Sequence, residues 1–169
     1  MAEGAGSPHF DAAGRARMVP VADKVPTSRR PVARGAVTLS EEGFAAVAGG
    51  RAGKGDVLGV ARLAGIMAAK RTAEWILLCH PLALTSVEVR FRLRRPQVEV
   101  EAEAACVGPT GVEMEALTAV SASCLAVYDM TKAYGRGHVI GDIRLTAKSG
   151  GRSGDWRRQG EAEWETEAL

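Results

Sequence analysis

Two neighbouring stretches near the middle of the chain alternate strictly between apolar and charged positions. Residues 85–94 alternate valine, phenylalanine and leucine with mostly basic residues, and residues 98–107 alternate apolar residues with glutamates. A period of two is typical of β-strands, because successive side chains point to opposite faces of a sheet. Arg95-Pro96-Gln97 joins the two stretches and predicts a hairpin, with ion pairs between its basic and acidic strands.

The longest stretch with a helical period begins after Gly108-Pro109 and continues to about Lys132. Its apolar residues recur every three to four positions, which predicts a helix with one buried side. Thr110 and Glu113 have the three-residue spacing of a capping box, so we expect them to cap the N-terminus of this helix.

Two shorter helices are predicted in the first half of the chain. Ser40 precedes an apolar pattern that runs to Ala48, and Asp56 precedes one that runs to about Arg71. Serine and aspartate are preferred N-cap residues, because their side chains accept hydrogen bonds from the first N–H groups of a helix. The second helix is rich in alanine and glycine, which suits close packing against another helix.

Further strands are expected at residues 32–39 and 138–147. The resulting order of strand, helices, strand, strand, helix and strand is the split βαβ pattern of ferredoxin-like folds. This is an α+β class with an antiparallel sheet and helices packed on one face. We expect one domain at 31–155, a mobile N-terminal arm at 1–30 and a disordered polar C-terminal tail at 156–169.

Composition and charge narrow the classes of function. Of the 169 residues 46% are hydrophobic and 25% charged, and the net charge of +2 is too small to indicate nucleic acid or an anionic membrane as a partner. We expect no signal peptide and no membrane span, because no basic-then-apolar start and no long apolar run is present. The three cysteines form no Cys-x-x-Cys pair, which disfavours a zinc ribbon or a disulfide framework and indicates a reducing cytoplasm.

Two local sequences outside the long helix suggest chemistry without settling it. Lys54 lies between two glycines just before a helix, which suits either a phosphate or catalytic site or simply a flexible loop with a solvated lysine. His80 follows an apolar run and precedes a proline, so it is either a satisfied histidine in a fixed turn or a ligand or catalyst. A Cys79/His80 nucleophilic pair is disfavoured, since adjacent side chains on an extended chain point in opposite directions.

The long helix carries polar residues at both of its ends. Glu113 and Glu115 lie in the first turn, whereas Asp129 and Lys132 lie near the last and share one face. At 1.5 Å of rise per residue the two groups are about 20 Å apart, too far for one small ligand to touch both in one copy. If both groups act on one substrate, the site joins two subunits.

Six separated motifs, in order and at similar spacing, resemble the family of cyclic pyranopterin monophosphate synthases, the C protein of molybdenum cofactor biosynthesis. The likeness covers about residues 10–155. The motifs are Lys54–Asp56, Ala64–Thr72, Leu78–Leu82, Thr110–Thr118, Tyr128–Lys132 and Lys148–Gly151.

The resemblance implies an enzyme that converts a cyclised dihydroguanosine triphosphate to cyclic pyranopterin monophosphate and pyrophosphate. It also implies a homohexamer, a trimer of dimers with sites at subunit interfaces. Asp129 carries over as the active-site acid, with Lys54 and Lys132 as catalytic or phosphate-facing lysines. The substrate-binding positions and site neighbours that carry over are Leu78, Cys79, His80, Glu113, Met114, Glu115 and Lys148.

The residue types suit this chemistry. A lysine that lies near another cation or is partly desolvated has a lowered pKa and can transfer protons, so we expect Lys54 and Lys132 to handle protons. Lys148 and Arg152, with Arg29 as a further candidate, would neutralise phosphates. Magnesium on the substrate phosphates stays open, whereas no carboxylate cluster indicates a metal site or a firm cofactor.

One departure and two alternatives accompany this interpretation. The family usually has His-Met-Val-Asp near the start, where this chain has Arg17-Met18-Val19-Pro20, so a role for that histidine or aspartate is in doubt here. The first alternative is a relative that binds nucleotide without turnover. The second is a ferredoxin-like RNA-binding module, which Phe91 alone supports poorly as the only aromatic residue of the two central strands.

Overall fold

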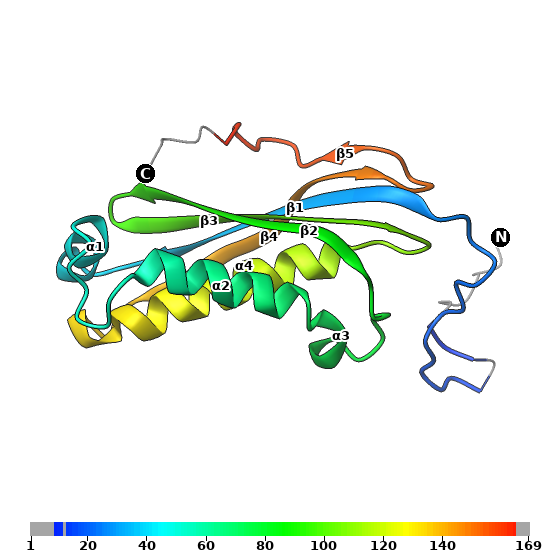
Figure 1. Ribbon diagram of the computed structural model, residues 1–169, viewed down its shortest axis with the longest axis horizontal. Helices are drawn as coiled ribbons and strands as arrows, with labels where there is room; N and C mark the ends of the chain where they lie inside the picture. The colour runs from blue at the N-terminus through cyan, green and yellow to red at the C-terminus, as the bar shows by residue number, and fades with distance from the viewer. Residues whose placement is uncertain (1–8, 12, 165–169) are drawn as a thin grey trace.

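The computed structural model describes residues 9–11 and 13–164, and its centre is a five-stranded antiparallel sheet with helices on one face (Figure 1). The strands lie in the order β2-β3-β1-β4-β5. The elements in chain order are β1 (Thr27–Thr38), α1 (Glu41–Ala48), α2 (Val57–Ala69), α3 (Thr72–Trp75), β2 (Leu84–Arg94), β3 (Gln97–Gly108), α4 (Glu113–Thr131), the 3-10 helix η1 (Lys132–Tyr134), β4 (Val139–Gly150) and β5 (Trp156–Arg157).

The first four strands confirm the predicted fold class. Their order, with β3 and β1 in the centre and every pair antiparallel, is that of the ferredoxin-like split βαβ fold. The hairpin of β2 and β3 turns at Arg95-Pro96, as the alternation predicted. Ser40 and Asp56 cap α1 and α2 with their side chains, which also confirms the sequence prediction.

The predicted capping box at the start of α4 is wrong. The N-cap residue is Val112, and no side chain caps the helix there, because α4 begins only at Glu113. Thr110 therefore lies too far upstream to reach the first N–H groups. The carboxylate of Glu113 turns back over Gly111 and also lies 3.5 Å from the Lys148 ammonium.

Both expected ends of the domain differ in the structure. β1 begins at Thr27, so residues 27–30 pair with β3 and β4 instead of belonging to the arm. The expected tail also has structure up to residue 164: β5 pairs with β4, and the chain then crosses the outer face of the sheet (Figure 1). The last part of the predicted tail, residues 165–169, lies outside the described residues, as do residues 1–8 of the arm.

Charged side chains hold this outer face together. Glu101 of β3 is only 2% exposed and accepts from Arg34 of β1 and Arg90 of β2 at 2.7 and 2.8 Å. Glu161 of the tail contacts Arg34 as well, and Trp164 stacks on the Arg92 guanidinium at 4.5 Å. The expected ion pairs across the hairpin are therefore present, but the tail and the neighbouring strands bury part of this face.

The opposite face of the sheet is apolar and packs against α2 and α4. Gly65 of α2 lies so close to α4 that an added Cβ would be 2.3 Å from Ser123 Oγ and 2.9 Å from the Ala119 carbonyl oxygen. This close approach sets the start of α2 beside the end of α4 (Figure 1). Within residues 9–11 and 13–164, no helix combines the length and the apolar character needed to cross a membrane.

Candidate active site

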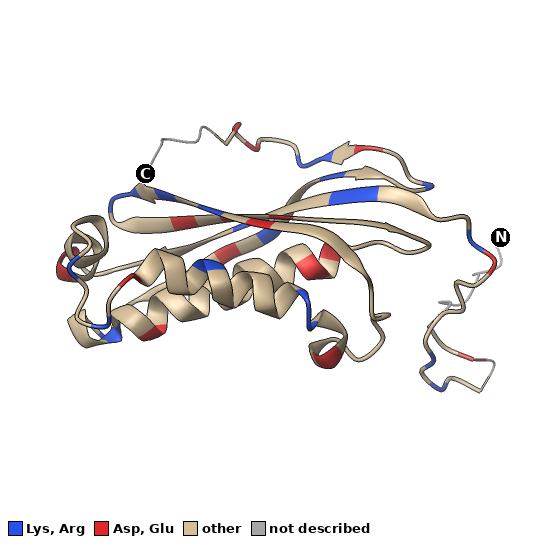
Figure 2. Cartoon of the chain, viewed as in Figure 1, with Lys and Arg blue, Asp and Glu red and all other residues tan. Residues whose placement is uncertain are grey.

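Three of the predicted catalytic residues form a charge cluster, which we define as Lys54, Asp129 and Lys132. The Lys54 ammonium donates to Asp129 Oδ2 at 2.7 Å and to the Asp129 main-chain carbonyl at 2.9 Å. The Lys132 ammonium lies 2.7 Å from Asp129 Oδ1. Lys54 comes from the loop before α2, whereas Asp129 and Lys132 lie at the end of α4, where Figure 2 shows charged residues of both signs.

The electrostatics of the charge cluster differ from the prediction in one respect. Hydrogen bonds from Lys132 and Lys54 hold the pKa of Asp129 down at about 2, so this carboxylate is ionised at physiological pH. The same contact raises the pKa of Lys132 above its ordinary value, because Asp129 stabilises the ammonium form. The expectation of a lowered lysine pKa is therefore wrong for Lys132, which stays a cation.

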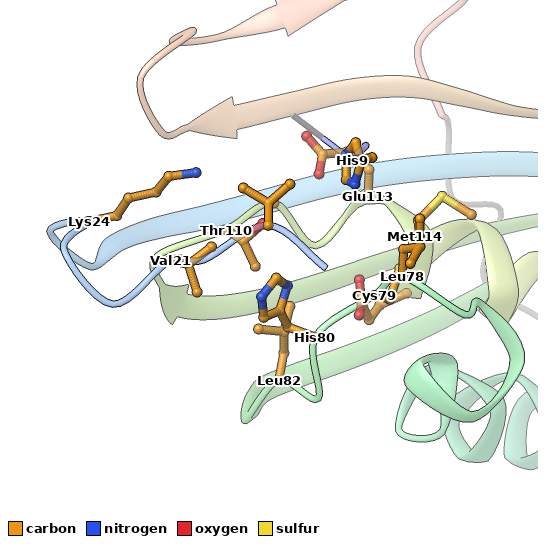
Figure 3. Close-up of a pocket in the computed structure, with 13 residues that line it drawn as sticks. His9, Val21, Lys24, Leu78, Cys79, His80, Leu82, Thr110, Glu113 and Met114 are labelled. Carbon is orange, nitrogen blue, oxygen red and sulfur yellow. The ribbon is translucent and has the colours of Figure 1, made fainter. Parts of the chain in front are cut away.

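The predicted substrate-binding residues line a cavity of about 310 Å³ near the start of α4 (Figure 3). The loop after α3 supplies one wall, and the turn into α4 supplies the other. Arm residues also line the cavity. The predicted residues on its walls are Leu78, Cys79, His80, Glu113, Met114 and Glu115.

Glu115 is the acid in this cavity whose protonation changes nearest to neutral pH. It is 3% exposed, and its burial, with a contribution from the Glu113 charge, raises its pKa to about 6. A carboxyl group with this pKa is suited to accept or donate a proton at physiological pH. Burial and the charge of Glu115 also raise the pKa of the Cys79 thiol, which makes its nucleophilic thiolate form less accessible.

The predicted phosphate-facing cations occupy different places. Lys148 lies on β4, 3.5 Å from Glu113 at the edge of the cavity, and also donates to Ser153 Oγ at 2.9 Å. Arg29 lies on β1 and donates to the Gly108 carbonyl at 3.1 Å, just before the turn into α4. Arg152 is exposed in the turn that follows β4, so its position alone does not assign it to the cavity.

Sequence reasoning missed the part of the site that the N-terminal arm supplies. Val19, Val21 and Lys24 line the cavity, together with His9, although their stretch has little periodicity. The only signal was the resemblance itself, since Arg17-Met18-Val19-Pro20 lies where the family has a motif. Leu82, Thr110 and Gly111 also line the cavity, and their nearness to predicted residues in the sequence could have indicated them.

The charge cluster and the cavity lie at opposite ends of α4, so the predicted site residues of one chain fall into two separate groups. The charge cluster offers two lysines paired with a carboxylate, and the cavity offers a buried acid among polar and apolar side chains. Such groups are typical of enzymes that act on anionic small molecules. Among the described residues, no group of three His, Cys, Asp or Glu side chains is arranged to hold a metal ion.

The chain belongs to the MoaC family, which it matches over residues 18–151. Curated relatives of similar sequence are named cyclic pyranopterin monophosphate synthase. The relative from Pelotomaculum thermopropionicum is 54% identical over 161 residues, which cover 94% of this chain and 95% of the relative. The relative from Thermomicrobium roseum is 59% identical, covering 89% of this chain and 92% of the relative. The relative from Cereibacter sphaeroides is 58% identical, covering 88% and 95%.

Proposed function

We propose that the chain is a cyclic pyranopterin monophosphate synthase, a lyase of molybdenum cofactor biosynthesis. Its substrate would be a cyclised dihydroguanosine triphosphate, and its products cyclic pyranopterin monophosphate and diphosphate. The observation that carries the proposal is the charge cluster, because family-like motifs 75 residues apart in the sequence meet there in direct ion pairs. The identity to relatives of that name over nearly the whole chain supports it.

The chemistry needs both cations and a proton acceptor. To close the cyclic phosphate, a substrate hydroxyl oxygen attacks the α-phosphorus, and the bond from that phosphorus to the diphosphate oxygen breaks. Lys54 and Lys132, both paired with Asp129, neutralise charge on the phosphates or the rearranging ring. Glu115 has the protonation behaviour to take the hydroxyl proton, and Lys148, Arg29 and Arg152 supply further positive charge for the leaving diphosphate.

We further propose a homohexamer, a trimer of dimers, in which the cavity of one protomer faces the charge cluster of another. The length of α4 supports this arrangement, because 1.5 Å per residue between Glu115 and Asp129 keeps the two groups about 20 Å apart within one chain. Apolar side chains on the open sides of the helices, at Val60, Leu63 and Leu125, offer surface for such contacts.

Other components follow from the same site. Any divalent cation that the reaction uses would enter with the substrate triphosphate, and we propose no resident cofactor or protein metal site. All three cysteines are free thiols, which suits a cytoplasmic enzyme. We propose no nucleic-acid partner, because Phe91 is 4% exposed beneath the helices and cannot stack on a base.

A coupled assay tests the proposal directly. Purified protein is incubated with the cyclised guanosine triphosphate intermediate, and diphosphate and a fluorescent pterin derivative are followed together. Both products should appear, and Asp129→Ala should abolish both. Lys132→Ala should leave substrate binding within a few-fold and lower product formation at least about a hundredfold, as expected when one fixed group that stabilises transition-state charge is lost.

The same assay separates the alternatives. Equal losses in binding and turnover for Lys132→Ala would contradict its catalytic assignment. Binding of the intermediate with neither product formed would identify a non-catalytic relative. Pro20 would then be the first residue to replace by the aspartate that the family usually has there.

A further inference from the structure

A partly buried polar network lies beside the charge cluster at the end of α4. We define it as Ser40, Thr131, Tyr134 and His138. His138 is 6% exposed, and its ring nitrogens lie 3.3 Å from Thr131 Oγ1 and 3.4 Å from Ser40 Oγ. Ser40 Oγ donates to the Tyr134 main-chain carbonyl at 2.9 Å, which ties the start of α1 to η1.

The network ends on the loop that carries Lys54. The main-chain N–H of Gly53 donates to the Tyr134 hydroxyl at 2.8 Å. Gly53 is exposed and lies in a turn between α1 and α2, where the structure gives its N–H this one protein acceptor. The Tyr134 hydroxyl is therefore the contact through which η1 fixes the loop, one residue before the lysine.

Each residue of the charge cluster directly follows, in the sequence, a residue that belongs to the network or contacts it. Gly53 precedes Lys54, and Thr131 precedes Lys132. Tyr128 precedes Asp129 and packs its ring edge against His138, with ring centroids 5.6 Å apart. Because an exposed ion pair between long side chains is weak and loses side-chain entropy, contacts of these neighbours with the network supply the rigidity that the cluster itself lacks.

The shape around the network leaves little room for it to rearrange. A Cβ added at Gly43 or Gly135 would lie 3.3 Å from His138 Nε2, so two glycines close around the ring. Thr131 is fully buried, and its hydroxyl donates to the Val127 carbonyl at 2.7 Å. The polar chain from Thr131 to Tyr134 is thus fixed to α4 at one end and to the Lys54 loop at the other.

We propose that Tyr134 is a positioning residue for the reaction, whose hydroxyl holds the Gly53–Gly55 loop so that the Lys54 ammonium stays on Asp129. This inference rests on the proposed function for its catalytic consequence, but its structural consequence can be measured without turnover. A catalytic group held in place contributes to rate through orientation, so loss of the hydroxyl should lower kcat more than it raises KM.

The test is Tyr134→Phe, which removes the hydroxyl and leaves the ring. Full-length protein is labelled at low conversion with an amine-reactive acetylating reagent, and the modification of each lysine is measured by peptide mass spectrometry. Labelling of Lys54 should rise about two- to tenfold, the equivalent of one net hydrogen bond, whereas the exposed Lys70 serves as the internal reference and stays unchanged. In the coupled assay kcat should fall at least about tenfold with KM within about threefold.

Each result decides the proposal. If Lys54 labelling is unchanged, Tyr134 does not position the loop and the inference fails. If KM rises while kcat holds, the hydroxyl acts on the substrate and the positioning role is again overturned. If Lys54 labelling rises in Tyr134→Phe while the unmodified enzyme itself forms no product, the positioning stands and the proposed function fails.

Discussion

Glu115→Gln should make the protein more stable at neutral pH while lowering its activity. Glu115 is 3% exposed, and burial raises its pKa from 4.5 to about 6. The folded protein therefore binds this proton more tightly than the unfolded chain. The contribution of Glu115 to stability is greatest below pH 4.5 and is lost as pH rises through the interval to about pH 6, where the native carboxyl ionises.

The size of the effect follows from the same shift. The shift of the Glu115 pKa from 4.5 to about 6 costs the native state about 1–2 kcal/mol at pH 7. The lower end of this range allows for residual contact of the carboxylate with solvent. Glutamine has a similar shape and never ionises, so the variant avoids this cost. With a slope of about 1–3 kcal/mol per molar urea, the unfolding midpoint should rise by about 0.5–1 M at pH 7.5.

Urea unfolding at pH 4.5 and pH 7.5, at one fixed protein concentration, measures the difference. The two proteins should be nearly equal at the lower pH and separate at the higher one. Glu42→Gln is the matched control, because Glu42 is exposed in the first turn of α1, and it should show no gain. A Glu115→Gln protein that is no more stable at pH 7.5, or equally stabilised at both values, would refute the reasoning. In the coupled assay Glu115→Gln should lose most of the rate. Its kcat should also no longer fall as the pH is lowered through about 6.

Two further predictions concern the assembly of the site and the packing that supports it. Mixed oligomers of His80→Ala and Asp129→Ala should recover up to about a quarter of the wild-type activity, because half of the dimers are hybrids and each hybrid has one intact site. Mixing Lys54→Ala with Asp129→Ala should recover no activity, since these residues meet within one chain. Activity in this second mixture would contradict a site that joins the cavity of one protomer to the charge cluster of another. So would a lack of activity in the first mixture once hybrid oligomers have been verified. Gly65→Ala should destabilise the protein by about 1–2 kcal/mol, as overpacking of about 1–3 kcal/mol outweighs about 1 kcal/mol of helix propensity. Urea unfolding should show Gly137→Ala, where an added Cβ meets nothing within 4 Å, close to the wild type, and a Gly65→Ala protein of equal stability would refute the packing argument.

The features predicted from local sequence are those that depend on local interactions. Ser40 and Asp56 cap their helices through hydrogen bonds to residues three positions later, so neighbouring residues suffice to predict them. The β2–β3 hairpin follows from its alternation and its short turn. The Thr110 cap failed because α4 begins two residues later than the motif assumes, and the sequence offers no rule for that choice.

The candidate site was predictable only in part. The pairing of Asp129 with Lys132 follows from their spacing on a helix. The glycines around Lys54 marked it only as a possible phosphate or catalytic lysine, and its contact with Asp129 across 75 residues could not be predicted from local sequence. The pKa of Glu115 depends on how deeply α4 is buried, and the pKa of Lys132 depends on its distance to Asp129. Neither pKa shift could therefore be predicted from the sequence. The contact between Arg34 and Glu161 spans 127 residues, which is why the tail was expected to have no structure.

The two faces of the sheet are covered by different kinds of interaction, and temperature affects these to different extents. On the helical face, burial is apolar, and its strength fades as the protein is cooled. On the outer face, Arg34, Glu101 and Glu161 form paired charges that the tail helps to cover. The free-energy cost of removing such charges from water falls as temperature rises. The ion pairs between the C-terminal segment and the sheet therefore contribute relatively more to stability at high temperature. The apolar packing of the helices therefore covers one face of the sheet at moderate temperatures, and the ion pairs on the other face supply a growing share of the stability as the protein is warmed.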